Sequence, residues 1–477
     1  MKLSQSILGL FLLLPIPLEA QVQHTLTLEQ AMEQTLGENK QIDIDHFAEQ
    51  SMLYKRKAMK GLHSPQFGLV AAYSHLSDDI KLDVNGLKPT VGGLLANFPA
   101  TIITPEVAKS IMGKDWAYKI QDKDFLTIGA TVSMPIFMGG KINAANRAAQ
   151  AELDIAKEEG NQNKAALRSE LIERYYGLSL AMQALEVRTE VLEGMEKHLA
   201  DALKLEKNGI VPKVDCLYAQ MKVAEAAAEV QKAKSALKTI TTALKNTLNQ
   251  PNYEGDIFPM SSMFVLKNIE DLNYFKDLAL KNNSILKQID LKTQLAKEAL
   301  KVERSAFMPE IAAMGGVALY NYQVTTFAPK WMVGAGLKFN IFDGLHRENS
   351  VRSAKSKVNQ VKAIGENAES DIEMLIEKLY NELLSTKDVY DTFASRIDFA
   401  KEYLRLKEIA FSNGMAPSQD VTDARLLLSK NRIEALQSAF DYDIALSKLL
   451  ENCGISEEFM QYKNSINYIP VYYTHEK

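Results

Sequence analysis

Cysteine, tryptophan and long apolar runs are all scarce in this chain. Its 477 residues include only two cysteines and two tryptophans. Cys216 lies near the start of one predicted returning helix and Cys453 just after the end of the equivalent helix in the other copy, and at ~1.5 Å rise per residue such a helix of roughly 38 residues puts its two ends tens of ångströms apart. A disulfide requires Cα atoms within ~7 Å, so we expect both to be free thiols. After the N-terminus no apolar run approaches the ~18 residues of a membrane helix, so any membrane contact would have to use strands.

The chain also lacks a strong excess of positive or negative charge. The net charge is −5 and the basic residues are spread along the chain, which argues against a nucleic-acid partner. The seven histidines show no paired-ligand spacing, and Gly139-Gly140-Lys141 lacks the flanking residues of a phosphate loop. We therefore expect no catalytic site, no cofactor and no metal site.

The N-terminus has the pattern of a secretory signal. Lys2 precedes an apolar core at residues 7–14, which is followed by Pro15 and Pro17. We assign residues 1–20 to a signal peptide. A buried N-terminal helix is the alternative, although the apolar core is short.

The most prominent feature present is an internal repeat. Motifs recur at a shift of 205 residues (342−137, 380−175, 414−209, 417−212, 420−215): Phe137 and Phe342, Tyr175 and Tyr380, Gly209 and Gly414, Pro212 and Pro417, Asp215 and Asp420. Upstream the shift is 244 (283−39, 309−65), so the first copy carries 39 extra residues (244−205) between Pro65 and Phe137. The predicted organisation is a first repeat at 21–250, a linker at 251–270, a second repeat at 271–455 and a tail at 456–477.

Each copy has the same predicted order of elements. An opening helix (28–62, 272–305) ends before a proline, and two strands of alternating polarity follow. Next comes a long helix without proline, an Asn-Gly-X-X-Pro turn and a shorter returning helix. The long helices are expected at 141–207 and 346–412, and the returning helices at 213–249 and 418–452. An opening helix plus a returning helix sums to ~110 Å, so two short helices would cover one long one.

Four strands per chain are too few to close a barrel, and an open sheet edge cannot sit in lipid. Closure therefore needs several chains, and three would supply twelve strands.

The order of short motifs, present twice, resembles that of the TolC-like outer-membrane efflux family. The motifs are Leu28-Glu29-Gln30-Ala31 with Asn39, Pro135-Ile136-Phe137, Asn340-Ile341-Phe342-Asp343-Gly344, and the two Asn-Gly turns. The resemblance implies a mainly α fold with a β-barrel part: a homotrimer with a 12-stranded barrel in outer-membrane lipid and a long α-helical barrel in the periplasm.

By the same resemblance, the protein would be a duct that receives small molecules or proteins from a periplasmic adaptor and an inner-membrane pump. The insertion at 75–116 would be an enlarged extracellular loop. A periplasmic adaptor or coiled-coil scaffold is the alternative, but an adaptor would need one hairpin flanked by compact β-domains.

Two sets of residues follow from the resemblance. Asp215, Asp420 and Asp423 match acidic positions that line the closed periplasmic entrance in the family, where a threefold ring would favour cations. The alternative is that these carboxylates only stabilise helix N-termini through the helix macrodipole.

The two turns are the expected adaptor-docking tips. The residues concerned are Asn208, Gly209, Pro212, Asn413, Gly414 and Pro417. The alternative is that these turns do no more than reverse the helices.

Overall fold

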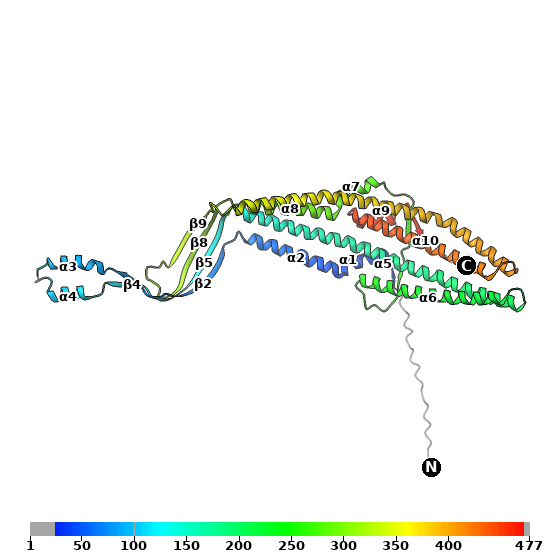
Figure 1. Cartoon of the computed structure of the whole chain (residues 1–477), viewed down its shortest axis with the longest axis horizontal. Helices are drawn as coiled ribbons and strands as arrows, with labels where there is room; N and C mark the ends of the chain where they lie inside the picture. Colours follow the sequence, from blue (N-terminus) through cyan, green and yellow to red (C-terminus); the bar gives the residue numbers. More distant parts are fainter. Residues whose placement is uncertain (1–23, 100, 472–477) are drawn as a thin grey trace, which may run out of the picture. The chain divides into compact units, whose positions relative to one another are not determined.

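The computed structural model describes residues 24–99 and 101–471 (Figure 1). The predicted signal peptide at 1–20 lies outside the described residues. The chain divides into two compact units: the first combines 1–49, 155–290 and 364–477, and the second combines 50–154 and 291–363. Within the described residues, no helix combines the length and the apolar character that a membrane crossing requires. Cys216 and Cys453 are both buried and free, as predicted.

The long helices are continuous, as predicted. The helix α5 spans Lys141–Lys207 and α9 spans His346–Ser412, each with 67 residues. Their returning partners, α6 (Lys213–Thr247) and α10 (Ser418–Asn452), have 35 residues each. The absence of proline allows this length, and apolar side chains at intervals of three and four give each helix a face to bury.

The opening helices differ from the prediction, because each is broken by an asparagine. The first is divided into α1 (Leu28–Glu38) and α2 (Lys40–Gly61), the second into α7 (Leu272–Asn282) and α8 (Ser284–Ser305). The backbone of Asn39 and of Asn283 is not helical, with ψ of 133° and 125°.

Side-chain hydrogen bonds explain both breaks. The Asn39 Oδ1 accepts from Gln41 N at 2.9 Å, and its Nδ2 donates to Thr247 O, at the end of α6, at 2.8 Å. Asn283 repeats this arrangement, and its Nδ2 donates to Asn452 O at the end of α10 at 2.7 Å. An asparagine that caps a new helix while satisfying another helix's last carbonyl ends the first helix.

The segment predicted as an irregular linker contains two strands. The strand β6 (Ile257–Pro259) pairs in parallel with β1 (His24–Leu26), and β7 (Met263–Leu266) pairs antiparallel with β10 (Tyr468–Val471). The tail adds a 3₁₀ turn, η2 (Ser456–Glu458), and the short helix α11 (Phe459–Lys463).

The apolar core of the first unit lies where these short strands meet the helices. The Tyr175 hydroxyl, on α5, donates to Leu26 O at 2.7 Å and accepts from Ser261 N at 2.9 Å. Buried aromatic rings surround it, among them Tyr176, Phe264, Tyr442 and Phe459. These long-range contacts give order to a segment whose own sequence shows no clear period.

The second unit contains one antiparallel sheet of four strands, which confirms the predicted number. They are β2 (Gln66–His75), β5 (Asp124–Met138), β8 (Glu310–Tyr322) and β9 (Trp331–Lys338). The order is β2-β5-β8-β9, so the repeats meet at the β5–β8 pair, and β2 and β9 are the edges. By this alternation β2 and β9 run antiparallel to each other.

The insertion at 75–116 is more regular than the loop expected from its prolines and glycines. The strands β3 (Ile80–Asp83) and β4 (Ala117–Gln121) form a two-stranded ribbon. The ribbon carries a 3₁₀ turn, η1 (Asn85–Leu87), and the helices α3 (Lys88–Ala96) and α4 (Pro105–Gly113). Pro105 opens α4 behind the capping residue Thr104, so this proline begins a helix instead of preventing one.

Candidate functional site

The two helix hairpins end in equivalent turns that contain all six predicted tip residues. Gly209 and Gly414 have φ of 74° and 69°, in the left-handed region that favours glycine. Behind them, Ile210 N donates to Leu205 O and Met415 N to Ala410 O, both at 2.9 Å, which closes each helix end. Pro212 and Pro417 then stand at the N-caps of α6 and α10. The asparagines, glycines and prolines of both turns are exposed.

The turns also lie near each other. A Cβ added at Gly414 would lie 3.1 Å from Ile210 Cγ2. The tips of the two hairpins therefore form one exposed surface within a chain.

The three predicted carboxylates occupy the first two turns of the returning helices. Asp215 and Asp420 hold the same position, two residues after the start of α6 and of α10. The Asp420 Oδ2 accepts a hydrogen bond from Lys407 Nζ on α9 at 2.6 Å, and this bond is the main reason that the pKa of Lys407 is raised. Asp423 is exposed one turn further along α10. The Asp420 carboxylate thus binds a lysine of its own hairpin.

A histidine that the sequence did not single out joins the hairpins close to these carboxylates. His198, on α5, is 6% exposed, and its Nε2 shares a hydrogen bond with Ser418 Oγ at 2.8 Å. Its ring packs on Phe411 with centroids 4.6 Å apart. Burial first, and then the charge of Arg425, lowers the pKa of His198. The ring is therefore kept neutral near pH 7.

Two arginines of α10 continue this line of contacts along α5. The Arg425 guanidinium lies against Gly194, where an added Cβ would be 2.0 Å from its Nη1, and it forms an ion pair with Glu408. Further along, Arg432 Nη1 lies 2.9 and 3.0 Å from the two carboxylate oxygens of Glu190.

A spacing in the sequence could have indicated these contacts. Glu190, Gly194 and His198 are four residues apart on one face of α5, and their partners Ser418, Arg425 and Arg432 are seven residues apart on α10. We call these six residues the α5–α10 contact line.

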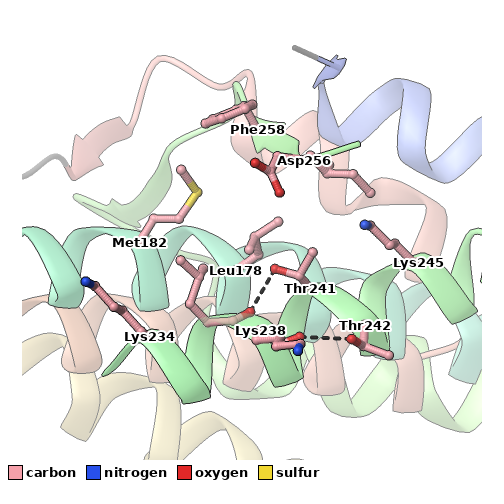
Figure 2. Close-up of a pocket in the computed structure, with 11 residues that line it drawn as sticks. Leu178, Met182, Lys234, Lys238, Thr241, Thr242, Lys245, Asp256 and Phe258 are labelled. Carbon is pink, nitrogen blue, oxygen red and sulfur yellow. Dashed lines mark hydrogen bonds between the residues drawn. The ribbon is translucent and has the colours of Figure 1, made fainter. Parts of the chain in front are cut away.

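The first unit also has a groove of about 500 Å³ between α5, α6 and the start of β6 (Figure 2). Lys234, Lys238 and Lys245 approach it from α6, and Leu178 and Met182 from α5. The Thr241 and Thr242 hydroxyls donate to backbone oxygens of their own helix at 2.7 and 3.0 Å. None of the predicted gate or tip residues lines this groove, and its lining residues offer no nucleophile paired with a base.

Each repeat thus supplies one long helix hairpin and two strands of the antiparallel sheet, which is a duplicated design. The sequence profile of the outer membrane efflux protein family matches residues 109–250 and 276–454, so the chain belongs to that family and resides in the outer membrane. Most of the insertion precedes the matched region.

Two curated relatives are similar at low identity. The alkaline protease secretion protein AprF of Pseudomonas aeruginosa is 20% identical over 351 residues, covering 71% of this chain and 72% of the relative. The protein CyaE of Bordetella pertussis is 23% identical over 267 residues, covering 54% of this chain and 56% of the relative.

Solved structures share the fold. The CmeC outer membrane channel of Campylobacter jejuni has a TM-score of 0.70 at 14% identity, covering 90% of this chain and 86% of that one. The outer membrane protein VceC of Vibrio cholerae has a TM-score of 0.68 at 16% identity, covering 90% and 96%. The fold of this chain is therefore that of an outer-membrane channel protein with a helical and a β part.

Proposed function

We propose that this protein forms a homotrimeric outer-membrane duct that carries cargo outward from a periplasmic adaptor and an inner-membrane pump. The observation that carries the proposal is the four-stranded sheet whose edges, β2 and β9, pair with no further strand of residues 24–99 and 101–471. In lipid these edges must find partners, because no water is available for their backbone groups. Since β2 and β9 run antiparallel, β9 of one copy can pair with β2 of the next, and three copies give a twelve-stranded barrel.

The cargo class is proposed from the relatives. AprF is named for the secretion of a protease, and CmeC is described as an outer membrane channel. We propose that the duct serves either a protein secretion system or a small-molecule efflux system. The rival function, a periplasmic adaptor or scaffold, does not account for a sheet with two open edges.

Asp215, Asp420 and Asp423 are proposed as the gate of the duct. A threefold arrangement of the hairpin tips would bring three copies of each carboxylate to one narrow entrance, where negative potential attracts cations. The neighbouring exposed turns, residues 208–212 and 413–417, are proposed as the docking surface for the adaptor.

Single-channel recording in planar bilayers tests the gate. The double variant Asp420→Ala with Asp423→Ala should lose most of its cation selectivity and its block by divalent cations, because six carboxylates leave the trimer's entrance. The matched control is Glu366→Ala with Glu369→Ala, two exposed carboxylates at the same spacing in α9 but far from the turn. Unchanged selectivity in the first variant would falsify the gate assignment.

The trimer is tested separately. Outer-membrane fractions should contain a band that migrates as a trimer in mild detergent and as a monomer after heating. Recovery of the protein as a soluble periplasmic species would contradict the duct. Crosslinking in cells, followed by identification of the captured adaptor and pump, then distinguishes secretion from efflux.

A further inference from the structure

The α3–α4 hairpin, described at residues 88–99 and 101–113, is a regular part of the insertion. At its base Asn85 Oδ1 accepts from Trp116 N at 2.9 Å, and Asn85 Nδ2 donates to Asp115 Oδ1 at 2.6 Å. Val84 N also donates to Trp116 O at 3.1 Å, which extends the β3–β4 ribbon up to the helices. These bonds fix where the two helices leave the ribbon.

The two helices contact each other along small side chains. A Cβ added at Gly92 of α3 would lie 3.1 Å from Met112 Cε of α4, so the glycine lets the helices come close. Val91 and Leu95 on α3 and Ala108 on α4 are half-buried at this contact.

A second apolar stripe has no cover among the residues that the structure describes. Beside the face of α3 that contacts α4, the side chain of Leu94 is 59% exposed, and that of Phe98, just after α3, is 52% exposed. On α4, Val107 is 49% exposed and Ile111 is 38% exposed. No residue of α3 or α4 is buried. Each helix has nine residues, below the ~12–15 at which isolated helices are even marginally stable in water. The stripe therefore needs a partner for the hairpin to be stable.

The charge pattern shows which side faces water. Residues 89–105 contain no charged side chain. On α4, Glu106 and Lys109 lie on the side away from Val107 and Ile111, by helical spacing. The hairpin thus has one polar side and one apolar side, as a helix buried in an assembly has.

The position of the insertion in the sheet identifies the partner. The insertion leaves β2 at its C-terminal end, and β2 is an edge strand. In the proposed trimer this edge pairs with β9 of the neighbouring copy, so the hairpin emerges at the boundary between copies. Other copies of the chain are present wherever the sheet is closed, whereas any other partner would have to be supplied separately.

We propose that the α3–α4 hairpins of three copies pack through Leu94, Phe98, Val107 and Ile111 into a six-helix cluster beyond the end of the barrel. This inference rests on the proposed trimer and adds to it a second contact between copies, outside the lipid. The cluster covers the apolar stripes of all three hairpins and holds the copies together beyond the strands.

Cysteine crosslinking in the full-length protein tests this contact. The two native cysteines are buried, so a single added cysteine reports its own surroundings. Leu94→Cys, near the threefold axis, should give covalent dimers on mild oxidation and should be protected from a water-soluble maleimide. The matched control is Lys109→Cys on the polar side of α4, exposed in the structure, which should label quickly and form no dimer.

A replacement variant provides a second measurement. Because Val84 and Trp116 are already a bonded pair, residues 85–115 can be replaced by an Asn-Gly turn that closes the ribbon. The trimer should still form but should dissociate at a temperature lower by about 5 °C or more.

The outcomes separate the two proposals. An intact heat-modifiable trimer in which Leu94→Cys labels as fast as Lys109→Cys and forms no dimer overturns the cluster but leaves the duct standing. The same labelling result together with protection in the presence of lipid vesicles would assign the stripe to a membrane instead, and also overturns the cluster. If no trimer forms in the unaltered protein, the proposed function fails first.

Discussion

Outside the insertion the two copies of the repeat share the order of their helices and strands, but the polar contacts of their hairpins differ. At the tips the Asn-Gly turn, the proline and the first aspartate are the same in both hairpins. Lys407, which binds Asp420, is replaced in copy one by Ala202 (407−205). Ser418 and Arg425 are replaced by Lys213 and Gln220 (418−205, 425−205).

The long helices differ in the same way. His198 corresponds to Tyr403 (403−198 = 205), and Gly194 corresponds to Phe399. In copy two these aromatic rings stack on each other with centroids 5.7 Å apart. The α5–α10 contact line therefore has no equivalent between α9 and α6. We conclude that duplication preserved what sets the turn, while the contacts between hairpins diverged because the two sides of each hairpin meet different neighbours.

The equivalent tyrosines Tyr175 and Tyr380 provide the sharpest test of this divergence, with the largest expected effect. Tyr175→Phe leaves the buried Ser261 amide without its partner and removes one of the two hydrogen bonds that Leu26 O accepts, the other coming from Met260 N, which should lower the free energy of unfolding by about 1–3 kcal/mol. Tyr380 is only half-buried, so Tyr380→Phe should cost much less. Thermal unfolding in detergent measures both. Equal losses would show that the two copies use this position alike.

Breaking the Arg432–Glu190 ion pair of the contact line should have the next largest effect. Arg432→Met removes the positive charge that pairs with the Glu190 carboxylate. This change should destabilise the α5–α10 contact by about 1 kcal/mol. We expect more frequent openings in single-channel recordings. Arg396→Met removes an ion pair between α9 and α10 of one hairpin and serves as the control. A control variant that opens as often would mean that the contact line does not hold the tips closed.

A pH change should act on the contact line through His198. Its pKa is lowered in the folded protein, so acid favours any state in which the ring is released. The contact is at full strength above ~6.5, the ordinary pKa of histidine, and weakens as the pH falls below it. Arg425, Asp201 and Asp215 are the charged groups that act on the ring.

The measurement is the opening frequency between pH 7.5 and pH 5.5, which should rise several-fold on acidification. His198→Gln keeps a hydrogen-bonding group for Ser418 without titrating in this range, so its opening frequency should not respond. An equal response in that variant would assign the pH dependence to another group.

The smallest effect is expected at the exposed pair that only copy two possesses. Lys407→Ala frees the Asp420 carboxylate and removes a positive charge near the tip. Cation selectivity should increase slightly, in the opposite direction to the loss in the Asp420→Ala double variant. Planar bilayer recording checks the sign, and a decrease would place Asp420 away from the ion pathway.

Local sequence predicted those parts of the fold that depend on local physics. The limits of α5, α9 and α10 were correct because helical periodicity and the Gly-Pro turns are readable within a few residues. The opening helices were predicted as continuous, because Asn39 and Asn283 break them only when a carbonyl of another helix accepts from each side chain. The segment at 251–270 was predicted as irregular, because its strands pair with residues more than 190 positions away.

The sequence by itself determined the repeat, the long helices, the tight reversals and the four strands, since spacing, glycine torsion and proline chemistry act over short distances. Only the tertiary structure decided that His198 meets Ser418, that Arg425 occupies the space left by Gly194, and that the insertion carries a helix pair with an uncovered apolar stripe. The physical reason is that such contacts depend on which faces meet after the chain has folded. A local spacing can show which residues share a helix face, but not which other face they will meet.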